Sequence, residues 1–529
     1  MRETWQLIKF IVHRERIGLA IWLFGIVGFL VYLPFLYEGL YPTLADRYAA
    51  MTLMSNPAIV AIVGPSTGRY TLAAIFTQEV LLFTLVGIAM MNIMLVNRHT
   101  RVDEEFGRLE LIRSFPVSST TVLTAVFAVA FFANLLIGAT VATGFALSGV
   151  ESVTVAGSVL FGVILTVTGF FFTAITALAA QLFSTAKGSS GFAFMAMLVM
   201  YLLRAVGDMA GNFLSYLSPL GLILQTQPFV NNRWWPVIIV FLLAVALTGL
   251  AFYLVSNRDL GQGLISAKVG PREAKPSLLS TDGLAWRLQR GNLMAWLAGA
   301  LIIGMAYGAV IGEVETFVGD NEMIQMILAM TSDNDVSMIY QFIPFLVAFL
   351  VIVLLIPMLA PLLRLAGEEK RNLSEHLLAR VVARSGLLKS YFVISIIASV
   401  VLLFAAGLGF WLTGTIFLTE PITFATIMGT MMAHLPAAWL VIGITTVLVG
   451  WLPKLTSSAN LIIALMFFIS FFGAMLNLPQ FVLNLSPLSH IPSLPIDDFS
   501  LISFLVMTVI AACLMLIGFV GYNKRDITG

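Results

Sequence analysis

Hydrophobic residues along this chain fall into long continuous runs separated by short polar segments. A helix that crosses the hydrocarbon core of a bilayer needs about 20 mostly apolar residues. Because the runs lack the in-and-out alternation of barrel strands, they predict membrane-spanning helices rather than a β-barrel. The twelve predicted spans lie near Ile17–Tyr37, Leu72–Val96, Val122–Ser148, Val153–Phe183, Gly191–Val206, Trp235–Val255, Leu293–Ile311, Gln341–Leu363, Tyr391–Trp411, Pro436–Leu452, Leu461–Met475 and Leu501–Tyr522.

The composition supports an all-α integral membrane protein. Hydrophobic residues make up 59% of the 529 residues and charged residues 10%, against roughly 45–50% and 25% in soluble proteins. The apolar excess must face lipid. A formal net charge of +1 gives no bulk attraction to nucleic acid. The single cysteine, Cys513, excludes an internal disulfide framework.

Basic residues in the loops predict the orientation of the chain. With both termini in the cytoplasm, all of the 28 Lys and Arg except Arg47, Arg69, Arg204 and Arg233 lie on the cytoplasmic side, in agreement with the positive-inside rule. The first apolar run is longer than the roughly 7–15 residues of a signal-peptide core. We therefore expect an uncleaved first span.

Short sequence matches recur between the two halves of the chain. The matched pairs are Glu104 with Glu369 and Glu110 with Glu375 at an offset of 265, Ser189-Ser190 with Ser457-Ser458 and Leu217-Ser-Pro-Leu220 with Leu485-Ser-Pro-Leu488 at 268, and Arg16 and Trp22 with Arg290 and Trp296 at 274. Their common order indicates an internal duplication. We infer two six-helix halves of the same topology, related by a pseudo-two-fold axis along the membrane normal and enclosing a central path.

The segment between the halves is polar and contains Gly261-Gln-Gly263 and Gly270-Pro-Arg-Glu-Ala-Lys-Pro276. Such a composition resists packing and is typical of a flexible connector. The predicted domains are therefore a first transmembrane half over 1–255, a cytoplasmic linker over 256–291 and a second transmembrane half over 292–529.

Two charged segments carry apolar residues at helical spacing. Phe106, Leu109 and Ile112 recur in this way in the first half, and the second half repeats the pattern. The spacing predicts amphipathic helices over about 101–114 and about 367–384. One interpretation is a helix that lies on the membrane surface. The other, which two matched copies favour, is docking to a partner that itself has two equivalent faces.

The first of these segments resembles the coupling-helix region of ABC-2-type permeases. The motif is Arg98-x-x-Arg101-x-x-Glu104-Glu105-x-Gly107-Arg108-x-Glu110, followed by Phe115-Pro-Val-Ser-Ser119. The second copy departs from it, with Asn372 in place of Gly107 and Val381-Val382 in place of Pro116-Val117. The resemblance implies that charged residues of both copies couple the permease to an ATPase. These residues are Arg101, Glu104, Glu105, Gly107, Arg108, Glu110, Glu368, Glu369 and Glu375.

The length, the fused six-plus-six layout and the polar connector resemble the bacterial exporters of polyketide antibiotics, including those with polyether ionophore substrates. The resemblance implies the ABC-2/ABCG-type (type V) exporter fold, a bacterial plasma membrane location and outward transport of a large apolar compound. It also implies a short re-entrant helical hairpin before the last span of each half. The segments Asn212–Phe229 and Pro479–Pro495 occupy the corresponding positions.

The chain lacks the phosphate-binding loop Gly-x4-Gly-Lys-Ser/Thr of an ATPase. The closest string, Gly64-Pro-Ser-Thr-Gly68-Arg69, has the wrong spacing and no lysine, and it predicts a turn. We therefore expect ATP and Mg²⁺ to bind a separate ATPase subunit, present in two copies because one chain provides both halves. For this chain we expect no cofactor, no catalytic residue and no metal, since its histidines show no metal-ligand spacing.

Glu79 is the one acidic residue well inside an apolar run. Carboxylates within a membrane are costly and usually face a cavity or a partner. One hypothesis is that Glu79 lines the translocation path and contacts a polar or cationic part of the substrate. The alternative is a structural acid, protonated or paired with Gln78, near the outer interface.

Aromatic and thioether side chains on the second, fifth and eleventh spans extend this predicted path. In ABC-2-type transporters the corresponding spans line the central cavity, and such side chains suit large apolar substrates. The candidates are Phe83, Met90, Phe194, Met197, Met466 and Phe468. Arg204 and Asp208 are four residues apart, which favours an intrahelical ion pair over a gate.

Two functional hypotheses compete. The favoured one is the membrane permease subunit of an ATP-driven exporter of large apolar compounds, with lipid flipping as a variant of the same machinery. The alternative is an ion-coupled twelve-span secondary drug transporter. That class carries several acids or an arginine within its spans, whereas this chain offers Glu79 and keeps its charge clusters at the cytoplasmic surface. A non-transporting scaffold protein has little support beyond hydrophobicity.

Overall fold

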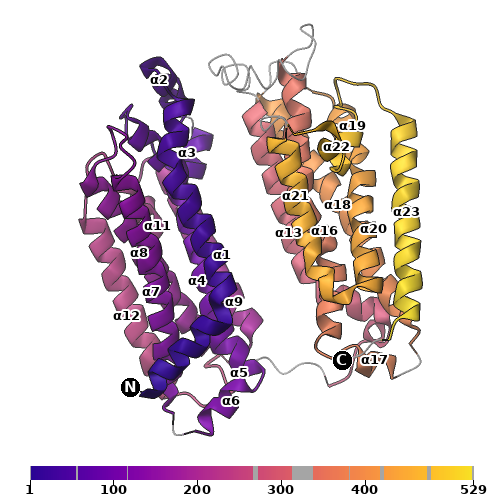
Figure 1. Ribbon diagram of the computed structural model, residues 1–529, viewed down its shortest axis with the longest axis horizontal. Coiled ribbons are helices and arrows are strands. Elements are labelled where there is room, and N and C mark those ends of the chain that lie inside the picture. Colours follow the sequence, from indigo (N-terminus) through magenta and orange to yellow (C-terminus); the bar gives the residue numbers. More distant parts are fainter. Residues whose placement is uncertain are drawn as a thin grey trace. The chain divides into compact units, whose positions relative to one another are not determined.

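The computed structural model describes residues 2–54, 57–115, 117–265, 272–311, 338–379, 382–417, 422–473 and 478–526. Its contacts divide the chain into two helical units, Met1–Gly270 and Pro271–Gly529 (Figure 1). The described residues contain no β-strand. They form twelve helices that are long and apolar enough to cross a membrane, as predicted, and each unit contains six of them.

Six long helices form the first unit. They are α1 (Arg2–Leu40), α4 (Leu72–Asn97), α7 (Ser119–Ala146), α8 (Val155–Leu182), α9 (Ala186–Ala210) and α12 (Trp235–Ser256). The short helices α2 (Leu44–Leu53), α3 (Pro57–Val63), α10 (Leu214–Leu217) and α11 (Pro219–Leu224) follow α1 and α9, at the end of the bundle away from the N-terminus. At the N-terminal end, α4 continues into a π-helical turn (Arg98–Val102), α5 (Asp103–Glu105) and α6 (Arg108–Arg113).

Helices α4 and α8 lie in the core of this unit, and a buried polar cluster joins them to α7. Asn92 and Asn134 exchange two hydrogen bonds of 3.0 and 2.8 Å, and Thr173 donates to Asn92 at 2.9 Å. Each amide also donates to the carbonyl of the preceding helical turn. Such pairs hold membrane helices together, because an apolar surround offers their amides no other partner.

Small residues set the closest helix approaches. A Cβ at Gly138 of α7 would meet the carbonyl oxygen of Gly162 on α8 at 2.3 Å, so a larger residue there would push the helices apart. In the second unit, a Cβ at Gly450 would meet the carbonyl oxygen of Gly518 at 2.2 Å. Close backbone contact through glycine is characteristic of helix pairs in membranes.

The second unit also contains six candidate membrane spans, with short helices between some of them. Its helices are α13 (Thr281–Ile311), α16 (Met338–Glu369), α17 (Glu375–Leu378), α18 (Arg384–Phe417), α19 (Phe424–Ala433), α20 (Leu435–Trp451), α21 (Ala459–Phe472), α22 (Gln480–Leu483) and α23 (Leu501–Lys524). Short 3₁₀ helices cover Pro276–Leu279, Pro453–Ser458 and Pro487–His490. The tenth span therefore begins earlier than the predicted Pro436, with α19, and it is interrupted at His434.

The two segments with Leu-Ser-Pro-Leu each contain two short helices before the last span of their unit. Ser218 accepts a hydrogen bond from Gly221 N and caps α11, in which Pro219 is the first residue. In the second unit Ser486 precedes the 3₁₀ helix that begins at Pro487. A Ser-Pro pair thus begins a helix at the same point in both segments, and the serine side chain caps the helix in the first unit.

The predicted linker is partly structured at both ends. Leu264 N and Ile265 N donate to the carbonyls of Gln181 and Leu182 at 3.2 and 2.8 Å, so the segment after α12 is attached to the end of α8. At the other end α13 begins at Thr281, and 281–291 are helical rather than part of a linker. Arg and Gln are good helix formers, so this polar stretch extends the helix beyond the apolar run that predicted it.

Candidate functional site

The predicted coupling region of the first unit lies at the end of α4. The structure breaks the predicted helix of about 101–114 at Gly107, which has a left-handed backbone with φ 70°. Residues before it extend α4, and the six residues after it form the separate helix α6. Left-handed backbone costs an L-residue roughly 1–2 kcal/mol, and glycine avoids this cost.

The second unit has the same break. Asn372, at the position that matches Gly107, also has a left-handed backbone, with φ 59°. It separates the end of α16 from α17, so the predicted helix of about 367–384 is likewise divided. Asparagine is among the non-glycine residues that adopt this conformation most readily. The departure of the second copy from the motif therefore preserves the backbone shape.

Several predicted coupling residues are paired within the first unit. Arg101 is buried and lies 2.7 Å from Glu104. Glu104 also accepts from Arg258 at 2.8 Å and from Gly261 N at 2.7 Å, both in the segment that follows α12. Glu105 accepts from Ala186 N, at the start of α9, at 2.8 Å. A carboxylate is favourable there because it faces the positive end of the helix dipole.

A further set of charges, of which only Arg108 is among the sequence-based candidates, joins this region to α1. Asp103 accepts from Arg14 at 2.7 Å and from Arg108 at 2.9 Å. Glu15 is buried and lies 3.0 Å from Arg98. The order of the spans in the sequence is enough to predict this contact. The first two spans run in opposite directions, so the charges before the first apolar run must lie near those that follow the second.

Glu15 also contacts a histidine in the π-helical turn that follows α4. Its carboxylate is 2.9 Å from His99 Nε2, and both side chains are buried. The end of α4 is thus tied to α1 through two neighbouring acidic contacts, and a displacement of one helix end must move the other.

In the second unit, the acidic pair at the end of α16 is also internally satisfied. Glu368 accepts from Arg364 at 2.8 Å and from the Tyr391 hydroxyl at 2.6 Å. Glu369 accepts from the Tyr522 hydroxyl and from Arg525, at the end of α23. These two carboxylates therefore join α16 to α18 and to the last helix.

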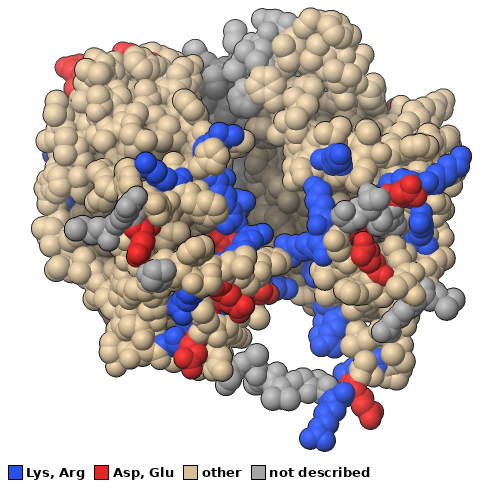
Figure 2. Space-filling view, turned by 60° about the horizontal axis from the view of Figure 1, so that its bottom comes forward, with Lys and Arg blue, Asp and Glu red and all other residues tan. Residues whose placement is uncertain are grey.

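Glu110 on α6 and Glu375 on α17 remain accessible. Both are exposed, and no hydrogen bond or ion pair holds either carboxylate among the described residues. Figure 2 shows that Lys and Arg side chains gather at this end of each unit, with Asp and Glu side chains among them. Glu110 and Glu375 match each other in the internal repeat, so each unit presents one free carboxylate on the short helix after its left-handed residue.

One face of α4 is uncovered within its own unit. Glu79, Phe83, Met90 and Met94 recur at intervals of four or seven residues, and the last three are 54%, 38% and 55% exposed. The residues between them are mostly buried. The predicted path residues Glu79, Phe83 and Met90 thus lie on one helix face.

The Glu79 carboxylate accepts a hydrogen bond from the Tyr37 hydroxyl. Gln78 does not pair with it, as one alternative predicted, but donates to the carbonyl of Gly64 at 3.4 Å. Tyr41, just beyond α1, lies close by. Burial raises the pKa of Tyr41 above its usual value, and the Glu79 charge raises it further.

The other predicted path residues differ in their surroundings. Phe194 and Met197 on α9 are partly buried and pack against the core of the first unit. Met466 on α21 is buried in the core of the second unit, whereas Phe468 is 45% exposed. Among these four, Phe468 is the one with a largely exposed side chain.

Arg204 and Asp208 form the predicted ion pair, at 3.2 Å. The structure adds contacts that the spacing did not predict. The buried guanidinium of Arg204 also donates to the carbonyls of Val60 and Ala61 at 3.2 and 2.5 Å. These carbonyls belong to the last turns of α3, and Arg204 thus attaches α3 to α9. A cation at a helix C-terminus is also favoured by the helix dipole.

Comparison with known proteins bears on the class of this membrane protein. The family described as "Multidrug efflux system permease Rv1217c, C-terminal domain" matches residues 8–254 and 278–523. The multidrug efflux system permease protein Rv1217c of Mycobacterium tuberculosis (strain H37Rv) is 34% identical over 532 residues, which cover 99% of this chain and 95% of that protein. The similarity thus includes both units, and the chain belongs to the family of the multidrug efflux system permease Rv1217c.

Proposed function

We propose that this chain is the membrane permease subunit of an ATP-driven exporter of large apolar compounds. The observation that carries the proposal is the 34% identity, over 99% of the chain, to a multidrug efflux permease. The twelve apolar helices agree with a protein that conducts compounds across a bilayer. The resemblance to ABC-2-type permeases supports ATP as the energy source and polyketide-like compounds as substrates.

Two copies of a separate ATPase subunit would dock at the short helices α6 and α17. Support comes from their repetition, since each follows a left-handed residue at the end of an equivalent long helix. Glu110 and Glu375 are the best docking residues because they are exposed and unpaired among the described residues. Glu104 and Glu369 are bound internally and would transmit motion instead.

The internal contacts suggest how a displacement of α6 would be transmitted to the long helices of the first unit. Asp103 ties the end of α4 to α1, Glu105 ties it to the start of α9, and Glu104 ties it to the segment after α12. These bonds are charge-assisted and short, and such bonds are about twice as strong as neutral ones. Displacement of α6 would therefore move four long helices of the unit together.

The exposed face of α4 would form a wall of the substrate path. Phe83, Met90 and Met94 present a flexible, polarizable apolar surface that adapts to different compounds. Glu79, held by Tyr37, provides the one acidic group on that face and would contact a polar or cationic part of a substrate.

Purification of the tagged chain from its native membrane tests the ATPase partner. We expect an ATPase to co-purify at two copies per permease. In Glu110→Lys and Glu375→Lys, efflux and stimulated ATPase activity should fall about tenfold at normal permease levels, because the reversed charge faces the docking surface. The matched control is Glu151→Lys, an exposed acid at the opposite end of the first unit.

Efflux that persists without ATP but collapses with the proton gradient would contradict the proposal and support ion-coupled transport. Equal activity of Glu110→Lys, Glu375→Lys and Glu151→Lys would leave ATP-driven export standing but remove α6 and α17 as the docking sites.

A further inference from the structure

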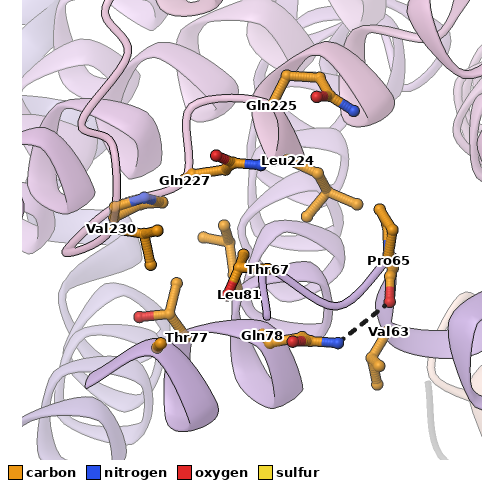
Figure 3. Close-up of a pocket in the computed structure, with 13 residues that line it drawn as sticks. Val63, Pro65, Thr67, Thr77, Gln78, Leu81, Leu224, Gln225, Gln227 and Val230 are labelled. Carbon is orange, nitrogen blue, oxygen red and sulfur yellow. Dashed lines mark hydrogen bonds between the residues drawn. The ribbon is translucent and has the colours of Figure 1, made fainter. Parts of the chain in front are cut away.

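A small pocket lies in the first unit, at the end of the bundle away from the N-terminus. On one side are the first turns of α4, with Thr77, Gln78 and Leu81. On the other are Leu224, at the end of α11, and Gln227 in the loop that follows (Figure 3). The loop between α3 and α4 closes a third side. The floor is buried, whereas the rim residues are partly exposed.

Three buried polar atoms of this pocket have no hydrogen-bond partner among the described residues, and one of them, Thr67 Oγ1, lies in the loop between α3 and α4. Thr77 and Gln78 are 6% and 7% exposed, and neither Thr77 Oγ1 nor Gln78 Oε1 has a hydrogen bond. The amide orientation of Gln78 follows from its other contact, because Nε2 donates to the Gly64 carbonyl and Oε1 is left as an acceptor. A buried polar atom without a partner costs roughly 1–3 kcal/mol, so a ligand that supplies the missing bonds gains by binding here.

The walls are held in place by the backbone. Gly64 has φ 108°, a conformation that favours glycine, and a Cβ there would come within 2.8 Å of Leu224. Gln227 and Phe229 have positive φ values of 47° and 62°. Conformations that are costly for non-glycine residues persist where the surroundings enforce them, and they concentrate at functional sites.

Phe229 anchors this loop in the core. Its ring centroid lies 5.7 Å from that of Phe76 on α4 and 6.0 Å from that of Phe145 on α7. Gln227, two residues earlier, is thereby held at the pocket. Backbone and core contacts therefore define the shape of the pocket, which is not a gap between mobile side chains.

The pocket also has a defined chemical character. Among the described residues, its lining contains threonine, glutamine and aliphatic side chains and no charged residue. Gln78 Oε1 is an acceptor, and a hydroxyl or an N–H group would satisfy it, while Thr77 Oγ1 can donate or accept. A charged ligand group would lose its hydration without an opposite charge to replace it.

We propose that this pocket binds a neutral hydroxyl- or amide-bearing group of the compounds that the permease exports. The inference rests on the proposed function, since it assigns a subsite to the exported compound. Thr77 and Gln78 receive the hydrogen bonds of that group, and Leu81, Leu224 and Val230 contact the apolar atoms beside it. The subsite selects neutral polar groups and rejects charged ones.

The test measures equilibrium binding of tritiated chloramphenicol, a neutral molecule with two hydroxyls and an amide, to the purified chain in lipid nanodiscs. In Thr77→Val the shape is kept and the hydroxyl is lost, so we expect binding to weaken by about threefold to tenfold, the effect of one hydrogen bond. The matched control is Thr168→Val, since Thr168 Oγ1 on α8 is also buried without a partner but lies outside the pocket.

Thermal stability separates a binding role from a structural one. Both valine variants remove a buried unpaired hydroxyl, so the Tm of each should stay equal to that of the parent or rise. Weaker chloramphenicol binding in Thr77→Val alone supports the subsite. Equal binding to the parent and Thr77→Val, or no binding to the parent, overturns it. The ATPase co-purification is independent of these results, so the two proposals can fail separately.

Discussion

At the scale of single residues, backbone conformation explains why the two halves of the chain can differ at one position of the charged motif. Asn372 replaces Gly107 in the second half, and by side chain alone the change looks like the loss of a motif residue. Both residues have positive φ, of 59° and 70°. The two residues share a left-handed backbone turn, which a comparison of residue types alone does not detect.

This equivalence predicts the result of exchanging residues at the turn. Gly107→Asn should fold and export like the parent, because asparagine adopts the same conformation in the second unit. Gly107→Ala should lose about 1–2 kcal/mol of stability, the cost of left-handed backbone for an L-residue. Thermal unfolding of the purified chain, combined with an efflux assay in cells, measures both. Equal destabilisation by Asn and Ala would show that the turn does not determine the effect.

Individual site residues were harder to predict than the segment that contains them. The motif located the charged segment, yet it could not show that Glu104 and Glu369 bond internally while Glu110 and Glu375 are exposed. Their partners, Arg258 and Arg525, lie more than 150 positions away in the sequence. Only the folded arrangement brings such residues together.

At the scale of secondary-structure elements, run length predicted which helices exist but not where they end. The first span was predicted at Ile17–Tyr37, whereas α1 extends from Arg2 to Leu40. The hydrocarbon core sets the length of the apolar run, while polar residues outside it continue the helix at little cost. The short helices at both ends contain too few residues to show a period, so sequence patterns predicted them poorly.

Arg204 shows how one side chain can position a whole element. It holds the last turns of α3 through the carbonyls of Val60 and Ala61 and pairs with Asp208, whose side chain is also buried. Arg204→Met should destabilise the end of the first unit away from the N-terminus by about 3–5 kcal/mol, because it leaves a buried carboxylate unpaired. The double variant with Asp208→Asn should recover part of this loss.

Thermal unfolding, together with the accessibility of a cysteine introduced at Ile62, measures the change. The double variant still lacks the bonds to α3, so it should regain stability while the cysteine stays more reactive than in the parent. A cysteine that remains protected in Arg204→Met would show that α3 does not depend on Arg204.

At the scale of the molecule, each unit has its own hydrophobic core. Composition and the twelve apolar runs predicted a helical membrane protein. They could not predict that the segment after α12 belongs to the first unit, since its polar composition is typical of a linker. Its attachment depends on Arg258 and Gly261, which bond to Glu104, and on Ile265, which bonds to the end of α8.

The position at which the chain is divided into two pieces should therefore affect efflux and thermal stability. Co-expression of 1–270 with 271–529 should retain efflux, because each piece keeps its core and its internal bonds. Co-expression of 1–256 with 257–529 should lower efflux and the thermal stability of the first piece, because Glu104 loses a tethered partner. Efflux assays with quantified membrane levels compare the two. Equal activity of both pairs would show that the segment after α12 acts only as a connector.

The uncovered face of α4 has a consequence for how such a protein can change over generations. On the opposite side of this helix, Asn92 is locked to Asn134 and Thr173, so nearly any replacement there loosens three helices at once. Phe83, Met90 and Met94 are exposed, so their replacement does not loosen these three helices. Selection for tolerance to new toxic molecules can therefore change the residue type at these three positions, while the residues on the inward side of the same helix stay the same.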